Sequence, residues 1–324
     1  MNTKYLCLVL FLVTIASFSQ IKDSLKTDIQ QFKINDNTTF EYAKPKTWDM
    51  FRYIPRDIAG LGKFAIQKEN LGYDGLAVGS TLAIIPFDQQ ITNGADKLGA
   101  DLGGWNKDSK YGKVGGLLTI IPKNIPSAVY YIGNGGTTFL LSGMFWGIGR
   151  IGKVDYRALN TSNELVEAIF SVGVVDQTIK RVTGRESPIK ATESGGAWNP
   201  FPSFNAFQKH TPNYDAMPSG HMATYIATVT IIATNYPEIK WIKPVGYSVG
   251  TLLAFNMVSG KVHWTSDYPI AIFMGYVMGK TIANRRIIKK ETALDLGLKK
   301  TTFKTNYTFN RYNNMNLIGA TVTF

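Results

Sequence analysis

The chain has 324 residues, with 35 lysines and arginines against 23 acidic residues and a formal net charge of +12. This length allows one large domain or two small ones with a substantial buried core. The single cysteine excludes a disulfide framework, and the basic charge favours an anionic partner, such as a phosphate ester or an acidic lipid headgroup, or else a basic surface without a specific partner.

Residues 1–19 have the organisation of a secretory signal peptide. Lys4 precedes an apolar run from Tyr5 to Ala16, and small residues follow before Gln20. About 12 apolar residues are too few to cross a bilayer as a helix, which argues against a membrane anchor. We therefore expect cleavage after Ser19, which removes Cys7. Export without disulfides suits a periplasmic protein of a bacterial envelope, free or associated with a membrane.

Residues 20–47 are polar and mixed in pattern, and we expect an N-terminal arm there. Residues 48–69 carry apolar side chains at helical spacing, interrupted by Pro55. Weakly charged stretches follow at 75–87, 124–149, 222–236, 244–260 and 268–279. These lengths favour the buried helices of an α-helical bundle over membrane-spanning helices, and a membrane-embedded bundle remains the alternative.

A capping-box sequence, Thr161-Ser162-Asn163-Glu164, predicts the start of a further helix. Gly184 is placed to end that helix, so Lys180 is expected in its last turn. Residues 191–215 are rich in glycine, proline, asparagine and aromatic residues, which predicts a long loop. The helical domain is thus expected over residues 48–290.

The pattern of apolar and polar residues changes after the basic residues at 285–290. Apolar and polar side chains alternate over 303–310 and again over 318–324, on either side of Asn313 and Asn314. This alternation predicts a C-terminal β-hairpin within residues 291–324, packed on the helical domain.

Two of the three histidines lie in short polar islands. The first of these islands is Met217-Pro218-Ser219-Gly220-His221. Ser219 stands where an N-cap belongs, ahead of an apolar helix, and the free N–H groups of a helix start suit a phosphate. Gly220 permits close approach of such a group, and His221 would face it. A helix start with a chance histidine is the alternative interpretation of this island alone.

The second histidine island is His263-Trp264-Thr265-Ser266-Asp267. On a helix, His263 and Asp267 would share one face because they are four residues apart. An aspartate bonded to one ring nitrogen fixes the tautomer and leaves the other nitrogen free to attack phosphorus. In isolation, a structural His–Asp pair would explain the spacing as well.

Together with the upstream island from Lys180 to Pro188, these motifs resemble the signature of the phosphatidic acid phosphatase type 2 and vanadium haloperoxidase superfamily. Its pattern is a Lys followed by Arg-Pro, then Pro-Ser-Gly-His, then Ser-Arg followed by a His and, four residues later, an Asp. The resemblance covers roughly residues 170 to 285. It implies an all-α fold, a helical bundle of the acid phosphatase and vanadium haloperoxidase type.

The resemblance also implies roles for individual residues. His263 matches the nucleophile that forms a phosphohistidine, Asp267 the group that orients it, and His221 the general acid. Lys180, Ser219 and the N–H of Gly220 match groups that neutralise the phosphate oxygens. No metal and no cofactor are implied in the phosphatase branch. Vanadate enters only as a phosphate analogue, or in a haloperoxidase, the less favoured alternative.

Two arginines of the family pattern are missing, since Ser187 and Met257 stand in their places. Lysine replaces the bidentate contacts of a guanidinium poorly. Arg185 and Lys261 lie close in sequence and would each restore one charge, unless they are ordinary solvated basic residues. The sequence therefore predicts a phosphatase, with a weakened phosphate- or lipid-binding member of the family as the alternative.

The expected substrate is a phosphomonoester or pyrophosphate, either on a phosphorylated membrane lipid or on a small phosphoester. An anionic membrane surface is the expected partner, because the chain is basic and carries an export signal. Nucleic acid is not expected as a partner, because no recognised binding motif is present and an exported protein rarely meets nucleic acid.

Overall fold

The computed structural model describes residues 28–105, 111–114, 118–291, 304–312 and 315–323. The predicted signal peptide at 1–19 and the first part of the predicted arm lie outside the described residues, as does the predicted turn at Asn313 and Asn314.

The described chain is mostly helical, which confirms the predicted fold class. Its helices are α2 (Asp49–Arg52), α3 (Ile54–Ile66), α4 (Leu71–Ile84), α5 (Asp88–Asp101), α6 (Ile125–Gly133), α7 (Gly135–Arg150), α8 (Tyr156–Thr183), α9 (Phe204–Lys209), α10 (Gly220–Asn235), α11 (Ile242–Ser259) and α12 (Tyr268–Arg286). The short helix α9 and one 3-10 turn, Thr211–Asn213, occupy part of the predicted long loop at 191–215. Among the described helices, none combines the length and apolarity needed to cross a membrane.

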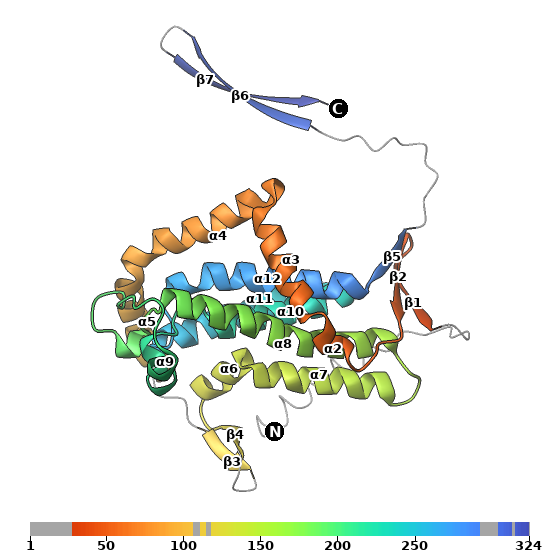
Figure 1. The fold of residues 1–324 in the computed structure, drawn as a ribbon, viewed down its shortest axis with the longest axis horizontal. Helices are drawn as coiled ribbons and strands as arrows, with labels where there is room; N and C mark the ends of the chain where they lie inside the picture. Colours follow the sequence, from red (N-terminus) through yellow and green to blue (C-terminus); the bar gives the residue numbers. More distant parts are fainter. Residues whose placement is uncertain (1–27, 106–110, 115–117, 292–303, 313–314, 324) are drawn as a thin grey trace.

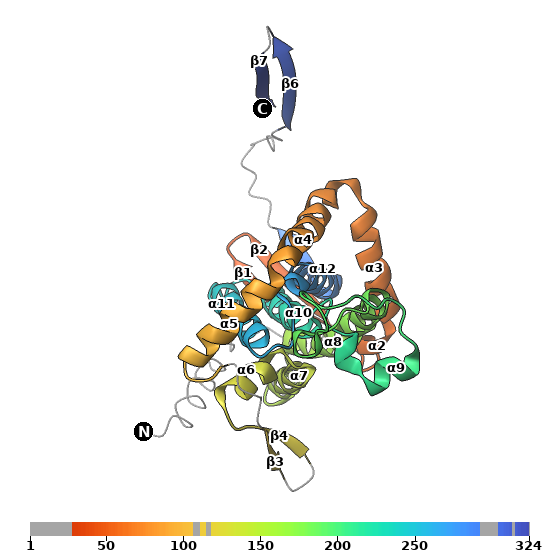
Figure 2. The same ribbon diagram turned by 90° about the vertical axis from the view of Figure 1, so that its left-hand side faces the viewer.

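Helices α7, α8, α10, α11 and α12 lie side by side and enclose the main apolar core (Figures 1 and 2). Helices α10 and α12 come closest to each other. A Cβ atom on Gly275 would lie only 2.3 Å from the carbonyl oxygen of Ala223, and one on Gly279 would lie 2.9 Å from that of Ala227. Glycine is therefore required at these two positions, because a larger side chain would push the two backbones apart.

The start of α8 differs from the prediction. The helix begins five residues before Thr161, where the Asp155 side chain caps it by accepting a hydrogen bond from the N–H of Ala158 at 2.9 Å. The Thr161 hydroxyl lies inside the helix and donates to the carbonyl of Arg157 at 2.9 Å. The capping-box spacing also occurs in the middle of a helix, so the local sequence pattern could not show where α8 begins. The predicted end is confirmed, because Gly184 has φ of 54° and stops the helix.

The predicted N-terminal arm is wrong over residues 29–43, which form β1 (Ile29–Asn35) and β2 (Thr38–Ala43). Strand β5 (Ile288–Glu291) joins them in a three-stranded antiparallel sheet of order β1-β2-β5. The sheet lies at one end of the bundle (Figure 1). Phe32, Phe40 and Tyr42 form a small apolar core of their own. The sequence pattern did not indicate these strands, because the few apolar residues are separated by polar ones.

Two further hairpins extend from the chain. Strands β3 (Tyr111–Val114) and β4 (Leu118–Pro122) form the first, and β6 (Lys304–Tyr312) and β7 (Met315–Thr323) form the second. The second confirms the predicted C-terminal hairpin, with Lys304 opposite Thr323 and Tyr312 opposite Met315. Figure 1 shows it apart from the helices, so the expected packing on the helical domain is not observed.

Candidate active site

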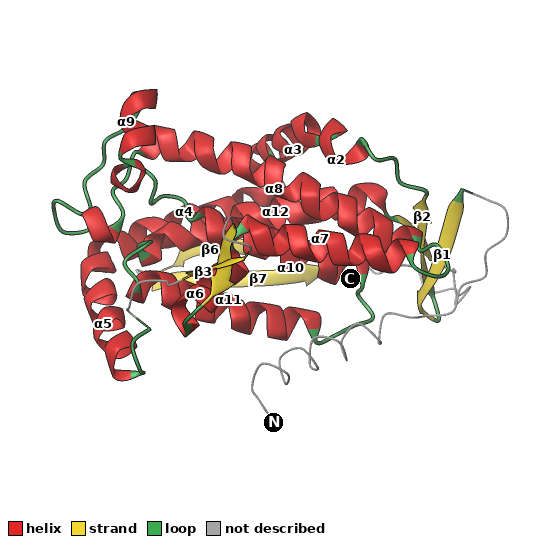
Figure 3. Cartoon of the chain, turned by 90° about the horizontal axis from the view of Figure 1, so that it is seen from below, coloured by secondary structure: helices red, strands yellow, loops and turns green. Residues whose placement is uncertain are grey.

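The three polar islands, numbered from here on in chain order as 180–188, 217–221 and 263–267, meet at the end of the bundle opposite the three-stranded sheet. Lys180 lies in the last turn of α8, and Ser219 caps the start of α10. Figure 3 shows α5 and α9 at this end of the bundle and β1 and β2 at the other. The N–H of Ser219 donates to the carbonyl of Asp267 at 3.2 Å, which joins the second island to the third. The hydroxyl of Thr183 donates to the carbonyl of Met217 at 2.7 Å and joins the first island to the second.

The two histidine rings face each other across this end of the bundle. Their centroids are 6.0 Å apart, a separation at which both rings can reach one phosphate group. The ring of Tyr130 on α6 packs against that of His221, with the two centroids 4.5 Å apart. Sequence reasoning missed Tyr130, because nothing in the motifs points to α6.

The start of α10 has the N-cap geometry that the sequence predicts for an anion-binding site. The Ser219 side chain accepts a hydrogen bond from the N–H of Met222 at 3.4 Å, as an N-cap does. The N–H groups of Gly220 and His221 have no partner within the helix, since the first N–H groups of a helix are always free of intrahelical bonds. These groups and the positive end of the helix dipole favour a phosphate oxygen at this point.

His263 is held by a backbone carbonyl rather than by Asp267. Its Nδ1 atom lies 2.7 Å from the carbonyl oxygen of Ala216 but 3.5 Å from Oδ2 of Asp267. A carbonyl can only accept, so Nδ1 carries the proton and Nε2 is left with its lone pair. Asp267 is the more distant of these two neighbours of Nδ1, and its expected role of orienting His263 stays a prediction. The two residues also share no helix face, because His263 precedes the 3-10 helix Thr265–Asp267.

Asp267 instead holds the loop that carries His263. Its Oδ2 atom accepts a hydrogen bond from the backbone N–H of Trp264 at 2.7 Å, and its Oδ1 atom accepts one from Arg185 at 2.8 Å. The side chain is completely buried. Burial raises the pKa of Asp267 to about 7, against the opposing effect of Arg185.

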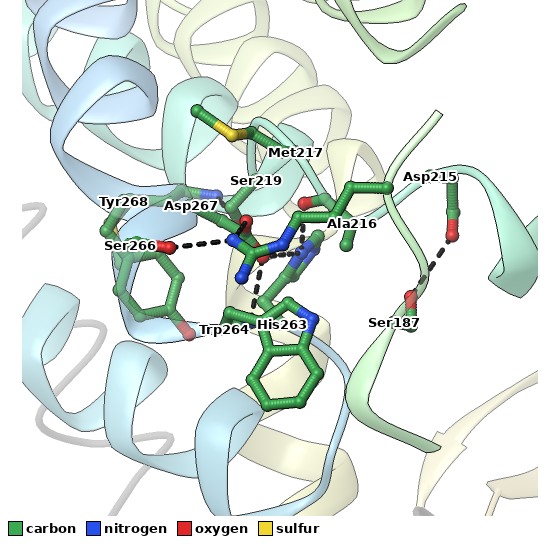
Figure 4. A network of polar contacts seen from close by, with 12 residues as sticks. Ser187, Asp215, Ala216, Met217, Ser219, His263, Trp264, Ser266, Asp267 and Tyr268 are labelled. Atoms are coloured by element: carbon green, nitrogen blue, oxygen red, sulfur yellow. Dashed lines mark hydrogen bonds and ion pairs between the residues drawn. The ribbon is translucent and has the colours of Figure 1, made fainter. Parts of the chain in front are cut away.

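Arg185 does not supply a charge to the phosphate site, contrary to the sequence-based expectation. Its Nη1 atom donates to Ser266 at 2.7 Å and to Asp267, and its Nη2 atom donates to Asp88 at 2.7 Å and to the carbonyl of Gly195 at 2.8 Å. Nε also donates to Gly195, so all five N–H donors are engaged. Figure 4 shows Ser266, Asp267, His263 and Trp264 gathered in this network. Arg185 therefore stabilises the loop that carries His263 instead of binding the phosphate.

Lys261 does not contribute to the phosphate site either. Its Nζ atom pairs with Oδ2 of Asp96 on α5 at 2.9 Å, and 44% of its side chain is exposed. The expectation that Lys261 restores a missing charge is therefore not met. The two arginine positions of the family pattern are also uncharged and buried. The hydroxyl of Ser187 donates to Asp215 at 3.2 Å, and Met257 is part of the apolar core.

Lys180 is a buried cation of the first island. Its Nζ atom lies 3.5 Å from Oδ2 of Asp176, one helical turn earlier on α8, and both side chains are buried. Burial raises the pKa of Asp176 to about 6, and Lys180 opposes the shift. Sequence reasoning missed Asp176, although its position four residues before Lys180 was a usable signal.

Both histidines of the site are neutral. Burial lowers the pKa of His221 to about 3, with smaller contributions from His263 and Lys180. Burial also lowers the pKa of His263 to about 3, with Lys180 the next cause. A neutral imidazole with its proton on Nδ1 is the nucleophilic form. Within the described residues, no group of three or more histidine, cysteine, aspartate or glutamate side chains could hold a metal ion.

Comparisons with known proteins agree with the motifs. Residues 162–287, which contain all three islands, match the model of a family described as the PAP2 superfamily. No curated protein matches the chain. A solved structure titled as the first transmembrane PAP2 type phosphatidylglycerolphosphate phosphatase from Bacillus subtilis is 12% identical, with 78% of this chain and 97% of that chain covered. Its TM-score of 0.29 is too low for a detailed comparison of the two folds.

Proposed function

We propose that this chain, whose residues 162–287 match the PAP2 superfamily, hydrolyses a phosphomonoester or pyrophosphate through a phosphohistidine intermediate. The observation that carries the proposal is the arrangement of the two histidines. His263 has its Nδ1 proton engaged by Ala216, and the ring of His221 lies 6.0 Å away beside the start of α10. Phosphate esters are the substrates of the superfamily in general, which agrees with this arrangement.

In the proposed reaction, Nε2 of His263 attacks phosphorus and forms a P–N bond while the P–O bond to the leaving group breaks. His221 gives a proton to the departing oxygen and later takes one from the water that cleaves the P–N bond. Lys180, the Ser219 hydroxyl and the N–H of Gly220 neutralise charge on the phosphate oxygens. The bound phosphate raises the pKa of His221 from its low value, because a nearby anion favours the charged imidazole.

We propose a membrane lipid as the substrate. The net charge of +12 favours an anionic surface, and large apolar side chains are exposed on α4 and α7. The signal-like sequence of residues 1–19 supports hydrolysis at the periplasmic face of a membrane. Phosphatidic acid, phosphatidylglycerol phosphate, lipid A and an isoprenoid pyrophosphate all carry the required group.

The test is release of inorganic phosphate by the purified protein from a panel of these four lipids. We expect turnover on at least one of them, and loss of that turnover in His263→Ala. His210→Ala is the matched control, because His210 follows α9 outside the three islands and should not affect the rate. Phosphate release that persists in His263→Ala would contradict the assignment of the nucleophile.

Phosphate or lipid binding without turnover is the second candidate. It is favoured by the two uncharged positions, Ser187 and Met257, and by the engagement of Arg185 and Lys261 elsewhere. In that case the wild type releases no phosphate from any lipid but still binds vanadate or phosphate. The double variant Ser187→Arg with Met257→Arg should then raise phosphate affinity or create turnover. An unchanged affinity in a folded double variant would contradict this reading.

A further inference from the structure

Asp176 presents a carboxylate oxygen that has no hydrogen-bond donor. Its Oδ2 atom lies 3.5 Å from Nζ of Lys180 and 3.4 Å from the side-chain amide of Gln177. Its Oδ1 atom is buried, and no donor in the described part of the structure reaches it. Only 4% of the residue is exposed, so bulk water does not solvate this oxygen. A buried acceptor without a donor destabilises the folded protein, so an oxygen of this kind indicates a missing partner.

The carboxylate lies at the start of α10, where the phosphate is expected. A Cβ atom built on Gly220 would lie 2.8 Å from Oδ2 of Asp176, which is closer than any side chain tolerates. Gly220 therefore leaves room for the carboxylate beside the free N–H groups of the helix. A phosphate bound to those groups would have Asp176 as a direct neighbour.

The charges at this end of the bundle make that neighbourhood costly for a doubly ionised phosphate. Lys180 is positive, Asp176 is its partner, and the two histidines are neutral. The guanidinium of Arg185 is already paired with Asp88 and Asp267. Until His221 gains a proton, a phosphate dianion beside an ionised Asp176 would place three negative charges against the cation Lys180. One proton between the carboxylate and the phosphate relieves this repulsion and supplies Oδ1 with a donor.

We propose that Asp176 accepts a hydrogen bond from a protonated phosphate oxygen, so that the site selects the singly protonated phosphate group over the dianion. This inference rests on the proposed function, because that function places a phosphate at the start of α10. It assigns Asp176 as a substrate-contacting residue that determines the protonation state of the bound phosphate. The motifs of the sequence do not include this residue.

The groups around Asp176 agree with a proton shared at this point. Burial raises the pKa of Asp176 to about 6, Lys180 and Gln177 oppose the shift, and Asp215 in the loop before α10 adds to it. The second pKa of a phosphomonoester is also about 6. Because the two values are close, the same proton can sit on either oxygen. The complex therefore holds one proton more than the separate protein and ligand do at a pH well above 6.

The test is calorimetric titration with phenylphosphonate, whose C–P bond the proposed reaction does not hydrolyse. Titrations at about pH 8 in buffers of different ionisation enthalpy give the number of protons taken up on binding. We expect the wild type and the control Asp96→Asn to take up about one proton and to lose affinity about tenfold per pH unit above the ligand pKa. Asp176→Asn should take up none at Asp176, and its affinity should be nearly independent of pH.

A proton could also be taken up by His221, and a second variant separates the two sites. In His221→Gln the uptake should persist if Asp176 holds the proton, and this variant also gives the decision if Asp176→Asn does not fold. Equal uptake in the wild type and in Asp176→Asn, or binding by the wild type without uptake, would overturn the inference. Proton-linked binding without phosphate release from any lipid would instead remove the phosphatase and leave the role of Asp176 intact.

Discussion

Arg185 is the residue whose role changes most between sequence and structure. The sequence places it beside a missing arginine of the family pattern, but in the structure its guanidinium joins Asp88 on α5 to Asp267 beside α12. The rings of Trp198 and Trp264 lie 4.8 and 5.3 Å from its Cζ atom and shield it from water. A buried cation that satisfies two buried carboxylates is a structural support, since removal of one partner leaves the others uncompensated.

Arg185→Ala should therefore lower the free energy of unfolding by roughly 3–5 kcal/mol, because it leaves Asp88 and Asp267 buried without their cation. Urea unfolding of the wild type and the variant measures this loss. Arg150→Ala is the matched control, since Arg150 is exposed at the end of α7 and should change stability by less than about 0.5 kcal/mol. An unchanged free energy of unfolding combined with weaker phosphonate binding would contradict the structural role and indicate that Arg185 binds the phosphate.

At the scale of the elements, the contact between α10 and α12 sets the geometry of the site. The second island begins α10 and the third leads directly into α12, so the distance between these two helices determines the distance between the two histidines. The helices approach at Gly275 and Gly279, where backbone atoms meet without intervening side chains. The site therefore depends on two glycines that carry no chemistry.

Gly275→Ala should destabilise the protein by about 1–3 kcal/mol or more and should lower activity, because the added methyl group meets the Ala223 carbonyl and separates α10 from α12. Gly173→Ala is the matched control in the middle of α8, where an added Cβ meets no atom within 4 Å. That variant should gain up to about 1 kcal/mol from helix propensity. Thermal unfolding of both variants measures the two changes in stability. An equal effect of the two substitutions would contradict the close approach of α10 and α12 at Gly275.

A second prediction at this scale concerns Glu164, which joins α8 to α10 through the side chain of Asn235. Burial raises the pKa of Glu164 from 4.5 to about 7, against the effects of Arg286, Asn235 and Arg285. The folded state thus holds a proton that the unfolded state releases between these two values. The contribution of Glu164 to stability is fully present below about pH 4.5 and is lost as the pH rises through about 7.

Glu164→Gln should remove this pH dependence while it preserves an acceptor for Asn235. Between about pH 4.5 and pH 7, the wild type should lose on the order of 3 kcal/mol more stability than the variant. Urea unfolding at both pH values measures the difference. The same slope in both proteins would show that Glu164 is ionised in the folded state throughout this range.

At the scale of the whole molecule, apolar side chains that face solvent combine with an excess of positive charge. On α4, Leu76 is 71% exposed and Leu82 is 62% exposed, while the helix carries one charged residue, Asp74. Exposed apolar side chains on a chain with a net positive charge favour binding to an anionic bilayer, with the leucines in contact with lipid.

The double variant Leu76→Gln with Leu82→Gln should bind vesicles of phosphatidylglycerol and phosphatidylcholine more weakly than the wild type, by about tenfold or more. The reason is that transfer of two leucine side chains from water into the bilayer contributes a few kcal/mol to the binding free energy. Ile288→Gln on β5 is the matched control, since Ile288 is also exposed but lies on the sheet at the other end of the bundle. Vesicle sedimentation measures the retained fraction. Equal retention of the wild type and the double variant would exclude α4 as the lipid contact.

The helical class, the end of α8 at Gly184 and the cap of α10 at Ser219 could be predicted from the sequence alone, as could the resemblance of residues 162–287 to the PAP2 superfamily. These features depend on spacing and chemistry within a few residues, such as the φ of a glycine or the hydroxyl of a cap. The true start of α8 was missed because the same capping spacing occurs inside the helix.

Only the tertiary structure decided which partner each polar side chain of the site has. The group that holds His263 is a carbonyl 47 residues away, and the carboxylate that occupies Arg185 together with Asp267 lies 97 residues away. The burial of Asp176 also depends on the packing of α8 against α10. This burial leaves one oxygen of its carboxylate without a hydrogen-bond donor in the described structure. Such pairings depend on distance in space and on exclusion of water, and neither is encoded in local spacing.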